Sequence, residues 1–372
     1  MKKISILGAT GSIGQSTADV IASAPGRFEV CTLTAHENKD KLEETAKRLG
    51  AKRTLLASHD GAAALDAAVQ PGTDITVAAI SGIAGLRPLM NAIRNSKVVA
   101  IANKEPLVAA GALVMAEAKK CGTTILPIDS EHNAVFQVFD ANNRSGIARI
   151  ILTASGGPFL NWSAEQMQSA TPEQAVAHPN WSMGAKISVD SATMMNKALE
   201  VIEAHVLFDM PPEKIDVVIH PQSVVHSMVE YADGSILAQM GASDMRTPIA
   251  YALAWPVRMA TPGQRLDLAA LGRLEFRAPD FQQFPALKLA YECLKSGPMA
   301  CLALNAANEV AVEAFLRKDI AFPAILEIID FALEQLPAGA LDSIEAIEAA
   351  DHAVRRRAAD YINNQLPKKR AS

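Results

Sequence analysis

Two acidic residues, Asp129 and Glu131, stand two positions apart where the extended apolar segment Leu126–Ile128 ends. If the strand continues through them, both side chains point to the same side, because successive side chains of a strand alternate. Facing a third carboxylate and a bound substrate, they would form an open oxygen-ligand site for a hard cation. A solvated acidic loop is the alternative for a pair this close in sequence.

The segment Lys186–Phe208 offers the third acid, Glu200. On a helix, Asn196 and Lys197 share a face with Glu200. The residues around them are almost continuously apolar, which indicates that this polar strip is buried. Glu200 is therefore expected to join the metal site, although an ordinary surface pair between Lys197 and Glu200 is the alternative.

The same segment has the chemistry of a phosphate site. Ser191, Asn196 and Lys197 offer hydroxyl, amide and ammonium donors, and donors of this kind bind phosphate oxygens. Asp190 or Ser191 is predicted to cap the helix that follows.

A strand, a glycine turn and a helix open the chain. The strand pattern Ile4–Leu7 is followed by the glycine-rich Gly8–Gly14, and helical spacing continues through Ile21. Such a turn lets the backbone approach a pyrophosphate, with helix amides pointing at it. Further strand and helix patterns alternate, which favours a doubly wound parallel sheet: strands over residues 28–34, 54–57, 75–79, 98–102 and 124–128, and helices over 39–49, 86–94 and 106–119.

Polar residues follow the second and fifth strands, at the ends where such sheets bind ligands. After the second, an acid favours NAD and a cation favours NADP, and the presence of both Glu37 and Lys39 leaves the choice open. After the fifth, a helix cap explains Asn103 and Glu105. A cap does not require a lysine, so Lys104 is assigned a functional role.

The middle of the chain is predicted to form a mixed sheet. Residues 155–184 form a long polar segment, and such loops are usually functional or mobile. Trp181 is a plausible cover for a substrate, or it pins the loop to the body. For His226 a structural role is the default. The predicted strands cover residues 148–153, 217–219 and 234–240.

A linker and a helical bundle are predicted to end the chain. Asn305, Asn308 and Glu309 are polar within an apolar helical face, as in a core network or an active-site contact. Helices are expected over residues 287–295, 299–317, 323–336 and 343–366. The predicted fold class is α/β: a Rossmann-type domain (1–123), a central α+β catalytic domain (124–254), a linker (255–285) and a C-terminal helical bundle (286–372).

The composition excludes several function classes. The 372 residues exceed one ordinary core, and the net charge of −5 gives no electrostatic reason for nucleic acid binding. The 4 cysteines have no metal-binding spacing, which fits a reducing compartment. The short apolar start does not make a signal peptide, and no apolar run approaches the ~18 residues of a membrane span. The cytoplasm is the simplest location.

Eight motifs, in this order, resemble the 1-deoxy-D-xylulose 5-phosphate reductoisomerase family. The resemblance runs from residue 4 to about residue 316. Any one motif alone is weak, and their common order makes the match specific. They are Gly8–Gly14, Ala102–Glu105, Pro127–His132, Ser155–Phe159, His178–Gly184, Val189–Lys197, His220–His226 and Leu304–Glu309.

The resemblance implies an enzyme of isoprenoid precursor synthesis that depends on NADPH and on Mg²⁺, Mn²⁺ or Co²⁺. It rearranges a ketose phosphate, reduces the product to 2-C-methyl-D-erythritol 4-phosphate, and is a homodimer in the family.

The resemblance also implies roles for individual residues. Asp129, Glu131 and Glu200 would ligate the metal and, with Lys104, form the catalytic set. The substrate would be bound by Ser130, Ser155, His178, Trp181, Met183, Ser191, Asn196, Lys197, Ser223 and His226. The dinucleotide would be bound by Thr10, Gly11, Ser12, Ile13, His36, Glu37, Asn38, Lys39, Asn103, Lys104, Glu105 and Gly184.

One departure and two rival functions remain. The family commonly has a glycine and then a basic residue after the second strand, whereas this chain has His36–Lys39. Either Lys39 takes over the 2′-phosphate or the preference for NADP is weaker. The rivals are a metal-assisted NAD(P) dehydrogenase of a hydroxy acid or semialdehyde, and a non-catalytic nucleotide-sensing module.

Overall fold

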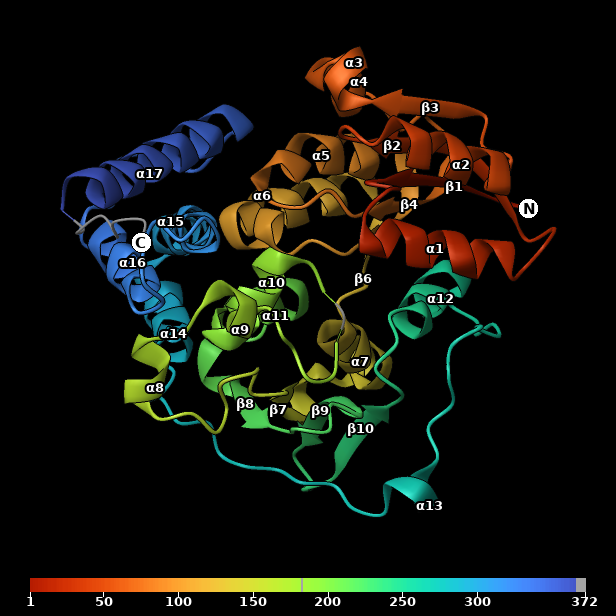
Figure 1. Cartoon of the computed structure of the whole chain (residues 1–372). Helices are drawn as coiled ribbons and strands as arrows, with labels where there is room; N and C mark the ends of the chain where they lie inside the picture. The colour runs from red at the N-terminus through yellow and green to blue at the C-terminus, as the bar shows by residue number, and fades with distance from the viewer. Residues whose placement is uncertain (182, 366–372) are drawn as a thin grey trace. The chain divides into compact units, whose positions relative to one another are not determined.

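A computed structural model describes residues 1–181 and 183–365 of the chain (Figure 1). The chain folds into two compact units. Unit 1 contains Met1–Pro106, Ala112–Ile150 and Val224–Gly272. Unit 2 contains Leu107–Gly111, Ile151–Ser223 and the chain from Arg273 onward.

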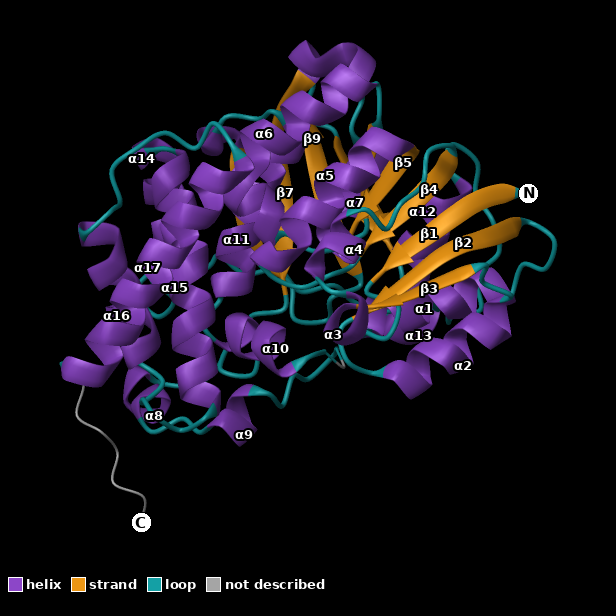
Figure 2. Ribbon diagram, turned by 90° about the horizontal axis from the view of Figure 1, so that it is seen from above, coloured by secondary structure: helices purple, strands orange, loops and turns teal. Residues whose placement is uncertain are grey.

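Unit 1 is built on a six-stranded parallel sheet in the order β3-β2-β1-β4-β5-β6, which confirms the predicted doubly wound sheet. Strands β1 to β5 lie side by side in Figure 2. Residues such as Ile4, Ile6 and Val77 are fully buried, as is usual for parallel strands covered on both faces. The strands are β1 (Lys2–Leu7), β2 (Phe28–Ala35), β3 (Arg53–Leu56), β4 (Thr73–Ala78), β5 (Ser96–Ile101) and β6 (Thr124–Pro127).

Helices connect these strands, and one distant helix completes their core. Ile249 and Leu253 of α12 (Arg246–Ala254) are buried in the same cluster as Ile4 and Ile6. The Lys2 ammonium donates to the carbonyls of Leu253, Ala254 and Trp255 at 3.2, 3.3 and 3.0 Å. The other helices are α1 (Ser12–Ala22), α2 (Lys39–Leu49), α3 (Ala57–Asp60), α4 (Ala62–Asp66), α5 (Leu86–Asn95), α6 (Glu105–Cys121), α7 (Ser130–Val138) and α13 (Leu268–Leu271).

A second sheet has four strands in the order β10-β9-β7-β8. Strand β7 (Ile147–Ala154) contributes residues to both units. Strands β9 (Val225–Tyr231) and β10 (Ile236–Met240) form an antiparallel hairpin, so the predicted hairpin partner is confirmed. The fourth strand is β8 (Ile215–Ile219).

The helices predicted for the C-terminal part are confirmed in unit 2. They are α14 (Ala286–Ser296), α15 (Pro298–Leu316), α16 (Ala324–Glu334) and α17 (Ile344–Asn364). The predicted end of the last helix, residue 366, lies outside the described residues. Among the described residues only α15 is long and apolar enough to cross a membrane, and 72% of that stretch is buried, as in the core helix of a bundle.

Residues 155–184 contain more regular structure than the sequence suggested. Two short helices, α8 (Ala164–Gln168) and α9 (Pro172–Ala175), each begin with a capping box. The signals were present in the sequence, because Ser163 and Thr171 each precede a glutamine by three residues. The segment ends at α10 (Ala185–Ala192), which is followed by α11 (Met195–Phe208).

Candidate active site

Asp129 and Glu131 lie at a helix start, so the prediction that a strand carries both was wrong. Strand β6 ends at Pro127, and Asp129 is the N-cap of α7, where its Oδ1 accepts the Glu131 N–H at 3.3 Å. A carboxylate suits this position because it accepts a hydrogen bond from an amide that has no partner within the helix. Its negative charge is also stabilised by the positive end of the helix dipole. The expected grouping survives, since oxygens of the two carboxylates lie within 4.8 Å of each other.

Lys104 lies against Asp129, with its Nζ 2.7 Å from Oδ2. The sheet register explains the contact: Ile101 of β5 pairs with Pro127 of β6, and the two residues follow these strand ends. Burial raises the pKa of the Asp129 carboxyl, but the Lys104 charge and the nearby His132 ring outweigh it and hold that pKa well below its usual range. Asp129 is therefore a carboxylate at neutral pH.

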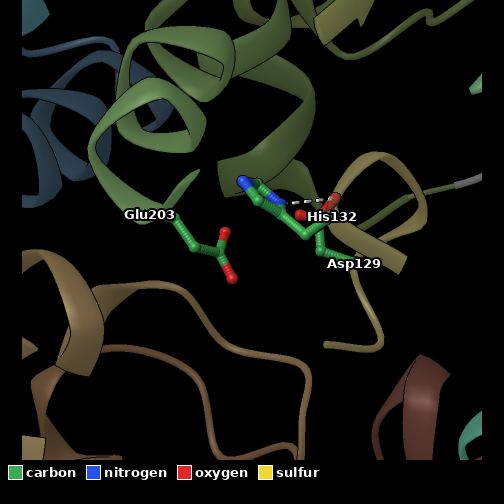
Figure 3. A group of neighbouring side chains, drawn as sticks. All are labelled: Asp129, His132 and Glu203. Carbon is green, nitrogen blue, oxygen red and sulfur yellow. Dashed lines mark ion pairs between the residues drawn. The ribbon is translucent and has the colours of Figure 1, made fainter. Parts of the chain in front are cut away.

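Two neighbours further orient the acids. The ring of His132 is fully buried, and its Nδ1 lies 3.6 Å from Asp129 Oδ1 (Figure 3). The Ser130 hydroxyl donates to Glu131 Oε2 at 2.5 Å. Glu203, the other residue drawn in Figure 3, belongs to α11. Asp129 and Glu131 thus start the helix with their carboxylates held by residues of the same unit.

The glycine turn after β1 requires its glycines. A Cβ on Gly8, where φ is +84°, would lie 2.4 Å from the Ala79 carbonyl oxygen, and one on Gly14 would lie 2.4 Å from that of Gly8. Gly11 is the N-cap of α1 and has no side chain to cover the first amides of the helix. Those amides are suited to a pyrophosphate.

The residues after β2 already have partners. Glu37 pairs with His36 at 3.3 Å, and the Asn38 side chain caps α2 by accepting the Lys41 amide at 3.0 Å. Lys39 lies 3.7 Å from Glu43, and its side chain is 69% exposed. An exposed pair of this kind is weak, so Lys39 is available to a ligand anion.

Asn103, after β5, has a buried side-chain donor. Its Nδ2 is buried and has no hydrogen-bond partner among the described residues. Gly85 allows this position, since a Cβ there would lie 2.7 Å from that nitrogen. An orphaned buried donor is costly, and a bound molecule that accepts from it would remove the cost. Glu105, the first residue of α6, is also buried.

In unit 2, the predicted polar strip of α11 is confirmed. Glu200 accepts hydrogen bonds from Asn196 Nδ2 and Lys197 Nζ, one to each oxygen. The side chains of Lys197 and Glu200 are only 4% and 1% exposed, which rules out the surface-pair alternative.

The prediction that Asp190 or Ser191 caps the next helix was wrong, since both lie inside α10. The chain turns between the helices at Met194, with φ of 61°, and the Thr193 hydroxyl accepts the Met195 amide at 3.2 Å. The apolar residues around this turn concealed the break from sequence patterns.

The glycine loop after β7 touches this junction directly. Gly157 has φ of +68°, and a Cβ there would lie 2.3 Å from the Ser191 carbonyl oxygen. The Ser155 hydroxyl accepts the Gly157 amide at 3.1 Å. Ser155 and Ser191, which are 36 residues apart, are thus brought to one place in unit 2.

His178 links the following loop to Ser155. Its Nδ1 accepts the amides of Asn180 and Trp181 at 3.2 and 3.0 Å, and its Nε2 lies 3.0 Å from Ser155 Oγ. Burial lowers the pKa of His178. Because Nδ1 accepts both amides, a neutral ring carries its proton on Nε2, from which it donates to Ser155.

Asn180 makes contacts that no sequence pattern predicted. Its side-chain amide donates to the Pro221 carbonyl at 2.6 Å and to Ser223 Oγ at 3.2 Å. Ser223 has φ of 54°, and His226 lies in β9 of unit 1. Met183 is half-buried, and Gly184 is the N-cap of α10. The motif His178–Gly184 contained Asn180, but only its contacts reveal a role.

Sequence profiles of one family match most of the chain. The profile described as 1-deoxy-D-xylulose 5-phosphate reductoisomerase matches residues 4–73 and 57–111. Profiles of C-terminal domains of the same enzyme match residues 125–208 and 240–357.

Individual relatives agree. The chain is 51% identical to the 1-deoxy-D-xylulose 5-phosphate reductoisomerase of Zymomonas mobilis, over 98% of both chains, and 51% identical to that of Ralstonia nicotianae, over 97% and 98%. It is similar to the structure of the Zymomonas enzyme in complex with NADPH, with a TM-score of 0.92, 48% identity and coverage of 98% and 100%. A reductoisomerase in complex with NADPH, fosmidomycin and magnesium gives a TM-score of 0.92, 44% identity and coverage of 98% of each chain.

Proposed function

The chain belongs to the 1-deoxy-D-xylulose 5-phosphate reductoisomerase family, and we propose that its two units divide the chemistry of that enzyme between them. The protein is an NADPH- and magnesium-dependent enzyme that converts 1-deoxy-D-xylulose 5-phosphate to 2-C-methyl-D-erythritol 4-phosphate in isoprenoid precursor synthesis. Near full-length identity of about half the residues is the observation that carries this function.

Asp129, Glu131 and Glu200 are the proposed metal ligands. The donor set fits, because hard divalent cations prefer carboxylate oxygens, and oxygens of Asp129 and Glu131 lie within 4.8 Å of each other. When bound, the cation polarises the substrate carbonyl and stabilises negative charge that develops on oxygen. Lys104 holds Asp129 in its charged form and contacts a substrate oxygen beside it. Ser130 also contacts a substrate oxygen.

The phosphate of the substrate is bound by Ser155, Ser191, Asn196 and Lys197. Two donors point at Ser155 Oγ, the Gly157 amide and the His178 ring, so the hydroxyl proton of Ser155 is directed away from both. That proton is then available to a phosphate oxygen. The buried ammonium of Lys197 supplies the charge that a phosphate dianion requires.

The loop that contains His178, Trp181 and Met183 covers the substrate. Ser223 and His226 are further substrate-binding residues. The contacts of His178 with Ser155 and of Asn180 with Ser223 support this role, because they fasten the loop beside the phosphate residues. Covering the substrate excludes water from the reacting carbon.

NADPH supplies the hydride, and the carboxyl ends of the strands in unit 1 bind it. The turn Thr10–Ile13 receives the pyrophosphate, the segment His36–Lys39 receives the adenosine end, and Asn103–Glu105 with Gly184 contact the remainder. The buried Nδ2 of Asn103 supports this assignment, because it has no hydrogen-bond partner in the part of the chain that the structure describes. Lys39 is the proposed partner of the 2′-phosphate.

The proposal keeps the predicted domains and their functions. Residues 1–123 bind the dinucleotide, residues 124–254 bind the metal and the substrate, residues 255–285 form a linker and residues 286–372 form a helical bundle. We also propose a homodimer in the cytoplasm. Four free cysteines fit a reducing compartment.

Product analysis tests the reaction, and metal titration tests the site. Incubation with 1-deoxy-D-xylulose 5-phosphate, NADPH and Mg²⁺ should give a branched carbon skeleton by carbon NMR, whereas a simple dehydrogenase would give an unbranched one. Glu200→Ala should weaken Mn²⁺ binding measured by calorimetry without substrate. Unchanged Mn²⁺ affinity would remove Glu200 from the metal site.

A further inference from the structure

A buried asparagine of α15 holds the residue that precedes Ser191. Asn308 is fully buried, and its Nδ2 donates to Asp190 Oδ1 at 2.8 Å. The other carboxylate oxygen of Asp190 lies 2.9 Å from the ammonium of Lys186, one helical turn earlier. The Asp190 side chain is 1% exposed, so both of its oxygens are fixed inside the protein.

The position of Asp190 makes this contact consequential. It lies in the last turn of α10, directly before Ser191, whose carbonyl oxygen leaves no room for a Cβ on Gly157. Two residues after α10, the chain turns at Met194 into the helix that carries Asn196 and Lys197. A shift at Asp190 would therefore move proposed phosphate residues on both sides of the junction.

The negative charge of Asp190 is a second reason why its orientation matters for phosphate binding. Asp190 is an anion one residue from a hydroxyl that is proposed to bind a phosphate, and a carboxylate turned toward that ligand would repel it. Lys186 balances the charge, while the neutral amide of Asn308 fixes the direction in which the carboxylate points.

We propose that Asn308 is a positioning residue of the phosphate site, acting through Asp190 to keep the carboxylate turned toward α15 and the α10–α11 junction in place. The inference rests on the phosphate site proposed above. It gives a function to a polar residue that sequence patterns left between a core network and an active-site contact.

A matched pair of variants tests it. Asn308→Leu removes the donor to Asp190, and Asn305→Leu makes the same change one turn earlier on α15, at an equally buried residue whose amide donates to Glu309 at 3.2 Å. The probe is inorganic phosphate, titrated against each variant and followed by phosphorus NMR. KM and kcat for the sugar phosphate, KM for NADPH and the free energy of unfolding are measured alongside.

We expect Asn308→Leu to weaken phosphate binding and raise KM for the sugar phosphate about 10-fold, the effect of losing one hydrogen bond to a charged group. Its kcat should fall less than KM rises, and Asn305→Leu should leave phosphate affinity within about 2-fold of wild type. Equal losses in both variants, or unchanged phosphate affinity in Asn308→Leu, would show that Asn308 only packs the bundle and would overturn the inference.

Two further variants keep the outcome decisive. If Asn308→Leu does not fold, the exchange of Asp190→Asn with Asn308→Asp restores one donor facing one acceptor. Phosphate affinity in the exchanged protein should recover relative to Asn308→Asp alone, and no recovery counts against the contact. Lys197→Met tests the phosphate site itself. If this variant binds phosphate as tightly as the wild type, the proposed phosphate site is wrong. If Lys197→Met loses phosphate affinity while Asn308→Leu keeps it, only the role of Asn308 is rejected.

Discussion

The ammonium of Lys104 lies 2.7 Å from the carboxylate of Asp129, and the two side chains are 7% and 11% exposed. Lys104 ends the loop after β5, and Asp129 caps the helix after β6. The pairing of these neighbouring strands therefore places a cation and an anion of the proposed site in contact. The same buried pair ties the loop after β5 to the start of α7.

Lys104→Met should destabilise the protein by about 3 kcal/mol at pH 7, because it leaves a buried carboxylate without its partner. Lys104 lowers the pKa of Asp129, so this stability is present above the usual carboxyl pKa of about 4 and is lost as pH falls through the lower folded value. Urea denaturation at pH 7 and at progressively lower pH measures it.

Lys97→Met is the matched control in the same unit. Lys97 pairs with Asp74 at 2.8 Å, but its side chain is 77% exposed, so its loss should cost at most about 1 kcal/mol. If the two variants lose the same stability, burial does not strengthen the Lys104 pair.

Gly157→Ala should destabilise unit 2 and weaken phosphate binding. The new Cβ would lie 2.3 Å from the Ser191 carbonyl oxygen at a positive φ. Gly234→Ala is the control, because Gly234 has φ of +85° and no atom of the described residues lies within 4 Å of its Cβ position. It should cost only about 1 kcal/mol of backbone strain. The excess for Gly157→Ala should be about 2 kcal/mol by urea denaturation, and no excess would mean that the glycine loop does not press on α10.

Acid should loosen the loop that contains His178. Burial lowers the pKa of His178, so the seated loop favours the neutral ring and loses stability as pH falls below the usual value of about 6.5. Protonation would turn Nδ1 into a donor facing two amide donors. KM for the sugar phosphate should therefore rise between pH 7 and 5.5.

His178→Gln provides the comparison, because glutamine keeps a donor for Ser155 and does not titrate. Its KM should depend less on pH in that range. Nitrogen NMR of the wild type should show the proton on Nε2 at pH 7.5. A proton on Nδ1, or an identical pH profile in His178→Gln, contradicts this account.

Lys39→Ala should raise KM for NADPH by about 10-fold and leave KM for NADH nearly unchanged, since only NADPH has the 2′-phosphate. Lys47→Ala removes an equal charge from the exposed last turn of the same helix and controls for general electrostatics. Initial rates with both cofactors measure the effect. Equal changes for NADPH and NADH would remove Lys39 from this role.

Local sequence determined much of the molecule. Alternating apolar runs and glycine turns predicted the parallel sheet, and apolar periodicity placed the four C-terminal helices, because both signals lie within one element. Eight contiguous motifs were enough to identify the family. The spacing of Asn196, Lys197 and Glu200 likewise gave their common helical face, since three and four residues make one turn.

Tertiary structure decided which elements meet. No local pattern says that Lys104 touches Asp129, that Asn308 reaches Asp190 across 118 positions, or that α12 closes the core of the first sheet. These relationships depend on strand order and helix packing, in which residues distant in sequence become neighbours, and periodicity along one segment carries no information about its neighbours in space.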